Sequence, residues 1–273
     1  MTLPSGRGEM PIALPTAMNH EFIIASSGLA AFGLSINFGI MIGSINQVNW
    51  AAQYTSLNEK GYCIVPGVLS KKECDFISEL YQNDELYRTT INMQRFRFGK
   101  GEYKYFNYPL PEPVQTLRDA LYRPLAVLAN EWMKCLGLDA RFPSTHNSLL
   151  EECKANGQLR PTPLILKYET GGFNALHQDL YGKIYFPFQV VLVLSESGKD
   201  YEGGEFVLVE QMPRAQSRAE VICPHQGDAL IITTNFRPVK GTRGYYRAKM
   251  KHGVSPLKSG TRYAMGIIFH DAK

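Results

Sequence analysis

The sequence lacks the cysteine spacing that a disulfide framework or a structural zinc site requires. Its five cysteines are widely separated, and no two of them form a C-x-x-C pair. Small disulfide-rich domains and zinc knuckles both depend on closely spaced cysteines. Their absence excludes these two classes and predicts free thiols, which suit a reducing cytoplasm.

The sequence also lacks an internal repeat and any low-complexity tract. A solenoid or another repeat array is therefore excluded. With 273 residues the chain can bury a full core, and one domain of this size is ordinary among all-β folds. The 24 glycines and 16 prolines favour many short strands and turns over a helical bundle.

Acidic residues are missing from one long stretch near the C-terminus. No Asp or Glu lies between Asp228 and Asp271. The same stretch contains the basic residues Arg237, Lys240, Arg243, Arg247, Lys249, Lys251, Lys258 and Arg262. The formal net charge of the chain is only +4, so composition alone does not indicate a nucleic-acid-binding protein. The stretch itself is predicted to generate a positive field.

Basic residues are also scarce before the one long hydrophobic run. Residues 22–45 form an uncharged run of 24 residues, which is long enough to cross a bilayer, but Arg7 is the only basic residue upstream. Signal peptides and membrane anchors usually carry a positive flank. We therefore expect residues 1–47 to form a hydrophobic extension, disordered or locally packed, on a cytoplasmic protein. Membrane association through residues 22–45 is the alternative.

Helical patterns predominate between residues 48 and 157. Ser70 and Glu73 form a capping box, which predicts a helix that begins at residue 71 and continues to about Tyr81. Two further helical patterns follow, one at residues 114–136 interrupted at Pro124, and one from a cap at Ser144 or Thr145 to Asn156. We expect these helices to form a buttress.

Strand patterns predominate after residue 158. Short runs rich in Val, Ile, Leu, Phe and Tyr are separated by Gly or Pro turns, at residues 163–169, 186–194, 205–210, 220–223, 228–234 and 262–269. Helices followed by strands predict a mainly β (α+β) protein, a sandwich or jelly roll with N-terminal helices packed on one side. We expect one domain at 48–273, with the helical buttress at 48–157 and a β core at 158–273.

A histidine and an aspartate stand two positions apart in "ALHQDLYGKIYFPFQ". In a strand, His177 and Asp179 would point to the same face, where both could bind one metal ion. A buried His hydrogen-bonded to Asp is the alternative interpretation of this pair. His252 offers a third ligand from a distant strand, and Arg262 follows ten residues later. Two histidines and one carboxylate define the facial triad of non-heme Fe(II), which leaves positions open for a cosubstrate and O2.

These motifs and their neighbours resemble the Fe(II)/2-oxoglutarate-dependent oxygenases. The segments "LKYETGGFNALHQD", "YEGGEFVLVE", "HQGDALII" and "HGVSPLKSGTRYAMGIIF" are similar to successive strands of that superfamily, in order and spacing. The resemblance implies a double-stranded β-helix, a cupin-like jelly roll whose mouth holds the iron. It also implies that the enzyme uses 2-oxoglutarate and O2 and hydroxylates a C–H bond, with release of succinate and CO2.

A closer resemblance joins residues 50–271 to a group of bacterial oxygenases described as acting on alkylated nucleic acid. It rests on "RFGKGEYKYFNYPLP", "GQLRPTPLILKY", "LHQDLYG", "GGEFVLVEQMPRAQSR" and "GIIFHDA". It implies that His177, Asp179 and His252 bind Fe(II) and that Arg262 holds the distal carboxylate of 2-oxoglutarate. Tyr168 is a second candidate for that cosubstrate, with a core aromatic as its other interpretation. His225 and His270 lack a suitable spacing and are expected in turns or at the surface.

The first substrate hypothesis is oxidative demethylation of a nucleobase, a role in DNA repair. The segment "NFRPVKGTRGYYRAKMKHG" beside His252 interleaves basic and aromatic residues. Arg247 could bind phosphate, and Tyr245 or Tyr246 could stack on a flipped base. AlkB-type dealkylases carry a similar L-H-Q-D motif. They differ in having Arg and Asn where this chain has Ile268 and Ala264.

Two alternatives remain open from the sequence. The spacing of Tyr168, the H-x-D motif, His252 and Arg262 also resembles that of prolyl-hydroxylase-like enzymes, which predicts hydroxylation of a protein side chain or a small metabolite. A non-catalytic jelly-roll binding module is the third possibility. The sequence does not determine the oligomeric state.

Overall fold

The computed structural model describes residues 44–273, and the expected extension 1–47 therefore lies almost wholly outside the described residues. The same holds for the uncharged segment 22–45. Among residues 44–273, no helix combines the length and the hydropathy that crossing a bilayer would require.

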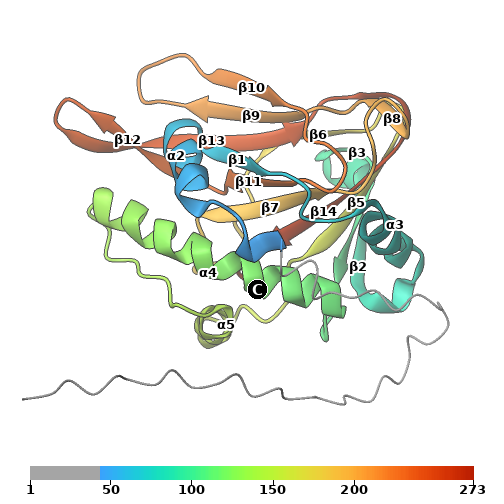
Figure 1. Cartoon of the computed structure of the whole chain (residues 1–273), viewed down its shortest axis with the longest axis horizontal. Helices are drawn as coiled ribbons and strands as arrows, with labels where there is room; N and C mark the ends of the chain where they lie inside the picture. Colours follow the sequence, from blue (N-terminus) through green and yellow to red (C-terminus); the bar gives the residue numbers. More distant parts are fainter. Residues whose placement is uncertain (1–43) are drawn as a thin grey trace, which may run out of the picture. The chain divides into compact units, whose positions relative to one another are not determined.

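The described chain is built around two antiparallel sheets (Figure 1). The larger sheet has the order β1 (Tyr62–Val65), β11 (Ala229–Thr233), β7 (Phe188–Val193), β14 (Leu257–Ile268), β5 (Leu164–Glu169), β4 (Glu102–Phe106) and β2 (Tyr87–Asn92), and β8 (Tyr201–Gly203) pairs with β14. The smaller sheet has the order β10 (Arg218–Ile222), β9 (Phe206–Gln211), β13 (Gly244–Val254), β6 (Phe173–His177) and β3 (Gly99–Lys100), and β12 (Phe236–Gly241) pairs with β13. The expected mainly β jelly roll, a double-stranded β-helix, is confirmed.

Strand β11 shows why its apolar run occupies the centre of the larger sheet. Ala229 and Ile231 enter one hydrophobic cluster, which includes the apolar faces of the helices. Leu230 and Ile232 point the other way and enter a second cluster, which includes Phe206 of the smaller sheet. Because successive side chains of a strand alternate faces, a strand buried on both sides reads as a continuous apolar run.

Helices cover the outer face of the larger sheet. They are α2 (Trp50–Lys60), α3 (Lys71–Glu79), α4 (Glu112–Cys135) and α5 (His146–Ala155), with short 3-10 turns at Leu80–Gln82 (η1), Asp84–Leu86 (η2) and Met93–Phe96 (η3). The predicted capping box at Ser70 and Glu73 is present. Thr145 caps α5, as the sequence indicated. The interruption expected at Pro124 does not occur, because α4 continues through it and buries one apolar face against the sheet.

The sheets extend across the expected division at residue 158. Strand β1 pairs with β11, β4 pairs with β5, and β3 pairs with β6, so segments before residue 158 contribute to both sheets. The helical buttress therefore also carries edge strands. The domain limits themselves stay a prediction.

The basic stretch forms the hairpin of β12 and β13, which the apolar patterns did not indicate. Arg247, Lys249 and Lys251 are exposed, while Ala248 and Met250 between them are buried. This alternation places His252 on the buried face of β13. Two of the basic residues do not contribute to a surface field, because Arg262 is buried and Arg237 is buried against Glu210, with nitrogen and oxygen 2.6 Å apart.

Candidate metal centre

The three predicted metal ligands meet at the mouth of the β-helix. His177 is the last residue of β6 and lies directly opposite His252 of β13 in the antiparallel register. Asp179 follows two residues later, with its Oδ1 3.6 Å from His177 Nε2 and its Oδ2 3.3 Å from His252 Nε2. One ligand atom from each residue lies within 4.8 Å of those of the other two. The structure therefore brings all three together.

Neighbouring groups orient the two imidazole rings. The Nδ1 atom of His177 lies 2.8 Å from the carbonyl oxygen of Ala175, which can only accept, so Nδ1 carries the proton and the Nε2 lone pair is free. The ring of His252 stacks on Phe206, with centroids 5.7 Å apart and planes 7° apart. Both rings therefore present Nε2 toward Asp179.

The electrostatics of the cluster keep its residues in the forms that bind metals. Burial acts to raise the pKa of Asp179, but the hydrogen bond with His252 and the attraction of either imidazole in its protonated form outweigh it, so the pKa lies below its usual range. Burial lowers the pKa of His252, and His177 lowers it further. A carboxylate beside a neutral imidazole is the state that coordinates a metal ion.

Tyr181 supports Asp179 and was missed at the sequence level. Its hydroxyl donates to Asp179 Oδ1 at 2.6 Å, and the hydroxyl of Tyr105 donates to Tyr181 Oη at 3.0 Å. The available signal was the two-residue period of His177, Asp179 and Tyr181. Second-layer hydrogen bonds of this kind orient a ligating carboxylate.

Arg262 lies in the same cavity, which has a volume of about 360 Å³. The side chain comes from β14 and is 3% exposed, and its Nε has no hydrogen-bond partner. Its guanidinium carbon lies 5.7 Å from the ring centroid of Tyr168 and 5.8 Å from that of Tyr201. No carboxylate within residues 44–273 forms an ion pair with it. A buried cation without a counter-charge is costly, so this position favours an anionic ligand.

Tyr168 lies beside Arg262, because the two residues are direct partners in the register of β5 and β14. Burial raises the pKa of Tyr168 to about 12, although the charge of Arg262 opposes this. The phenol therefore stays neutral. Asn174 Nδ2 donates to its hydroxyl oxygen at 3.3 Å, so the hydroxyl proton of Tyr168 remains available for a ligand.

The wall of the cavity is apolar at two positions where AlkB-type enzymes carry polar residues. Ala264 and Ile268 line it from β14, on the same strand as Arg262. The AlkB-type enzymes resemble this chain but carry Asn and Arg at these positions. Within the described part of the chain, Arg262 is therefore the one cationic group that β14 presents to the cavity.

The structure does not bring the predicted substrate residues to this cavity. Tyr245 is exposed on the β12–β13 hairpin, and Tyr246 Oη contacts Met212 Sδ at 3.3 Å. The guanidinium of Arg247 lies 5.0 Å from the ring centroid of Phe236. None of the three residues lines the cavity. Their role in substrate binding stays a prediction.

The two other histidines considered from the sequence differ in position. His225 is exposed in the turn before β11, as expected. His270 lies in the bend that follows β14, but it is fully buried, so of the two expected places the surface is wrong. Its Nδ1 accepts a hydrogen bond from the backbone N–H of Phe186 at 3.1 Å. The residue follows directly after β14 and packs into the core with that strand.

Comparisons with known proteins identify a family and agree with this fold. A family model described as "Oxygenase, catalysing oxidative methylation of damaged DNA" matches residues 101–272. Uncharacterized proteins from two strains of Mycobacterium tuberculosis are 49% identical over 167 residues, which is 61% of this chain and 72% of each relative. The crystal structure of a Pseudomonas putida prolyl-4-hydroxylase is similar in fold, with a TM-score of 0.50, 13% identity and coverage of 82% of this chain and 99% of that chain.

Proposed function

Because the chain belongs to the oxygenase family described as catalysing oxidative methylation of damaged DNA, we propose that it is an Fe(II)- and 2-oxoglutarate-dependent dioxygenase acting on alkylated nucleobases. Family membership makes the chain an oxygenase and hence an oxidoreductase. The observation that supports the use of 2-oxoglutarate is Arg262, a buried and unpaired guanidinium in the same cavity as the three clustered ligands.

The donor set fits Fe(II). Two imidazole nitrogens and one carboxylate converge, and no thiolate takes part. This combination suits an Fe(II) site with open positions and does not build the closed tetrahedron of structural zinc. His177, Asp179 and His252 would hold the ion. When bound, Fe(II) with O2 and 2-oxoglutarate supplies the oxidising chemistry that hydroxylates a C–H bond and yields succinate and CO2.

The cavity also fits 2-oxoglutarate. The planar guanidinium of Arg262 presents parallel donors that match a carboxylate. The neutral hydroxyl of Tyr168 can donate a further hydrogen bond. Apolar walls at Ala264 and Ile268 exclude water from this end of the cavity, which strengthens the charge pair. The chain's own residues thus bind and orient the cosubstrate and keep the reacting centre dry.

The proposed reaction on the base is a demethylation. Hydroxylation of an N-methyl carbon gives a hemiaminal, which loses formaldehyde and leaves the unmodified nitrogen. We therefore interpret the oxidation as removing the methyl group. Tyr181 keeps its proton on Oη and donates a hydrogen bond to Asp179, which stabilises that carboxylate in its ionised form.

A cytoplasmic location is part of the proposal. All five cysteines are free, and Cys63, Cys74 and Cys153 are buried. Free thiols are stable in a reducing compartment. The proposed partners are 2-oxoglutarate, O2 and an alkylated nucleic acid.

The test compares two histidine variants in one assay. The purified chain is incubated with Fe(II), 2-oxoglutarate and a methylated single-stranded oligonucleotide, and succinate and formaldehyde are measured. We expect His252→Ala to abolish both products. His225→Ala is the matched control, because His225 is exposed and does not line the metal cavity, and it should retain full activity.

Each outcome identifies a different function. Unchanged turnover by His252→Ala would contradict the ligand assignment. Succinate without formaldehyde would favour the alternative substrates, a protein side chain or a small metabolite. If the wild-type chain forms neither product with any substrate, the non-catalytic binding module becomes the better interpretation.

A further inference from the structure

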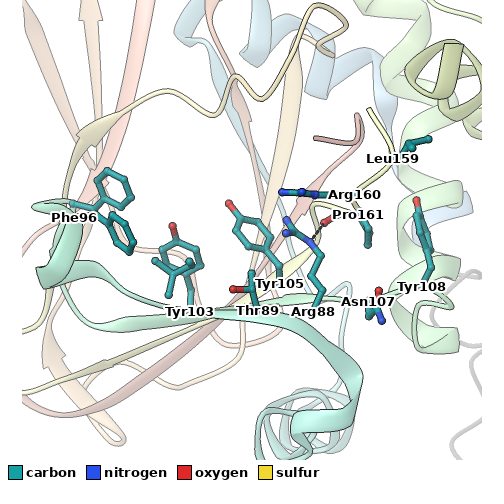
Figure 2. Close-up of a pocket in the computed structure, with 12 residues that line it drawn as sticks. Arg88, Thr89, Phe96, Tyr103, Tyr105, Asn107, Tyr108, Leu159, Arg160 and Pro161 are labelled. Atoms are coloured by element: carbon teal, nitrogen blue, oxygen red, sulfur yellow. Dashed lines mark hydrogen bonds between the residues drawn. The ribbon is translucent and has the colours of Figure 1, made fainter. Parts of the chain in front are cut away.

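A second hollow adjoins the metal cavity and has a volume of about 860 Å³ (Figure 2). We call it the lateral groove; it is lined by Arg88, Thr89, Ile91, Phe96, Phe98, Tyr103, Tyr105, Asn107, Tyr108, Leu159, Arg160 and Pro161. Phe98, Tyr103 and Tyr105 line both the groove and the metal cavity. The groove therefore runs up to the wall of the site where the reaction is proposed to occur.

Two arginines give the lateral groove a positive charge. Arg88 Nε donates to the carbonyl oxygen of Pro161 at 3.0 Å, and its guanidinium carbon lies 4.5 Å from the ring centroid of Tyr105. These contacts fix the side chain and leave its terminal nitrogens free of any hydrogen bond within residues 44–273. Arg160 is exposed and lies close enough to act on Arg88. Figure 2 shows Arg88 and Arg160 on the side of Tyr105 that faces away from Phe96 and Tyr103.

The two charges are not neutralised by the surrounding protein. Burial lowers the pKa of Arg88, and the positive charge of Arg160 lowers it further. The lining of the groove contains no Asp or Glu. The carboxylate of Asp271 also acts on Arg88, but it is already bound by Arg118 at 2.7 Å and Tyr108 at 2.8 Å. Two adjacent guanidinium groups without a counter-ion favour an anion with closely spaced charges.

Aromatic side chains stand at the end of the groove nearest the metal cavity. Phe96 is 54% exposed and Phe98 is 47% exposed, and their rings stack with centroids 5.5 Å apart. They belong to the run Arg95–Phe98, in which arginine and phenylalanine alternate and every residue is exposed. Arg97 adopts the left-handed conformation, with φ 60°, and lines the metal cavity. Exposed aromatic faces between arginines suit the stacking of nucleobases.

We propose that the lateral groove binds one strand of a nucleic acid, with phosphates on Arg88 and Arg160 and bases stacked on Phe96 and Phe98. The proposal rests on the proposed function and names the substrate's path to that site. A single strand is required, because the metal ligands lie at the mouth of the β-helix and a paired base cannot reach them without leaving its stack. The shared wall of Tyr103 and Tyr105 then leads the next base toward Asp179.

The experiment measures binding of a fluorescent single-stranded oligonucleotide over a range of salt concentrations. One variant removes charge, Arg88→Gln with Arg160→Gln, and Arg160→Gln alone is included because its exposed side chain has no packing role. A second variant removes stacking, Phe96→Ser with Phe98→Ser. The matched control is Arg123→Gln with Lys134→Gln, which removes two exposed charges from α4 outside the groove.

The two groove variants have different expected signatures. Each phosphate contact contributes about 0.7 to the slope of log affinity against log salt for a single strand, so the double arginine variant should lower that slope by about 1.4. The phenylalanine variant should weaken binding about tenfold and leave the slope unchanged, since stacking releases no counter-ions. The α4 control should change affinity by less than about twofold, because exposed charges outside a binding site act only through the screened field.

The outcomes separate this inference from the proposed function. If the arginine and phenylalanine variants bind and demethylate the oligonucleotide as well as the wild type, the groove assignment is overturned and the proposed function stands. If no methylated oligonucleotide yields formaldehyde but binding depends on these residues, the groove assignment stands and the proposed substrate falls. Displacement of the oligonucleotide by polyglutamate at equal charge concentration would show an acidic-peptide site and overturn the assignment to nucleic acid.

Discussion

Two of the arginines buried among residues 44–273, Arg118 and Arg262, have opposite surroundings. Arg118 of α4 is fully buried and donates to Tyr108, Ile268, Thr162, Phe269 and Asp271. Arg262 of β14 is 3% exposed, and its Nε has no partner. Burying a guanidinium costs several kcal/mol unless it is paired. Asp271 offsets this cost for Arg118, whereas no carboxylate among residues 44–273 pairs with Arg262. We call a buried charge saturated when its hydrogen bonds and counter-charge come from the protein, and such a charge stabilises the fold. A buried charge without these partners is unsaturated and indicates a ligand-binding site.

The first prediction removes the saturated charge. Arg118→Met should lower the free energy of unfolding by about 3–5 kcal/mol, because it leaves the carboxylate of Asp271 buried without its counter-charge. Denaturant unfolding measures this loss. Arg123→Met is the control, since Arg123 is exposed on the same helix and should change stability by less than about 0.5 kcal/mol. Equal stabilities of the two variants would contradict the structural role given to Arg118.

The second prediction removes the unsaturated charge. Arg262→Leu should weaken 2-oxoglutarate binding by about 2–5 kcal/mol, at least about 30-fold, because the carboxylate loses its only buried counter-charge. Calorimetric titration of the metal-loaded protein measures the affinity. Unfolding without 2-oxoglutarate should show no loss of stability, the opposite of Arg118→Met. A variant that bound 2-oxoglutarate normally, or that unfolded as readily as Arg118→Met, would remove the distinction between the two arginines.

The third prediction concerns His270, a buried histidine on which the charge of Arg118 acts. Burial, with a smaller contribution from the charge of Arg118, lowers the pKa of His270 to about 4. The unfolded chain therefore takes up a proton below about pH 6.5 that the folded chain does not accept. The stability from neutral His270 is complete above about pH 6.5 and falls as the pH decreases toward 4, by about 3 kcal/mol in total.

Comparison of the wild type with His270→Gln isolates this effect from other titrating groups. The difference in unfolding free energy between pH 7 and pH 4 should be smaller in the variant by about 2–3 kcal/mol. Arg118→Met should also reduce the pH dependence, since its charge contributes to the low pKa. Identical pH profiles for the wild type and His270→Gln would contradict the burial of a neutral imidazole.

Local patterns predicted much of the fold because the relevant physics is local. Ser70 and Glu73 cap a helix by contacts three residues apart, and the apolar run at 228–234 identifies a strand buried on both faces. The β12–β13 hairpin was not indicated, because its exposed basic residues obscured the alternation with Ala248 and Met250. The continuity of α4 at Pro124 depends on tertiary packing against the sheet, which no local pattern reports.

In the candidate site too, sequence patterns predicted some residues, and others were recognised only from the folded structure. His177 and Asp179 are close in sequence, His252 was predicted as the third ligand of a facial triad, and the resemblance to known oxygenases supplied the role of Arg262. Tyr181 and Asn174 were missed because each acts on the site through one hydrogen bond, to Asp179 and to Tyr168, and no sequence motif marks such a contact. The lateral groove is assembled from two regions far apart in the sequence, residues 88–108 and 159–161. Only the pairing of β2, β4 and β5 brings these segments together.

The last prediction tests the hydrogen bond between Tyr181 and Asp179, which lies in the same cavity as the unpaired Arg262. Tyr181→Phe removes the hydroxyl that donates to Asp179 at 2.6 Å and should weaken divalent metal binding about tenfold, the lower range for loss of a supporting hydrogen bond. Titration with Co(II) measures this affinity. Tyr105→Phe is the matched control, because its hydroxyl reaches Asp179 only through Tyr181 and its loss should cost less. If both variants bound metal as tightly as the wild type, the hydroxyl of Tyr181 would not position Asp179.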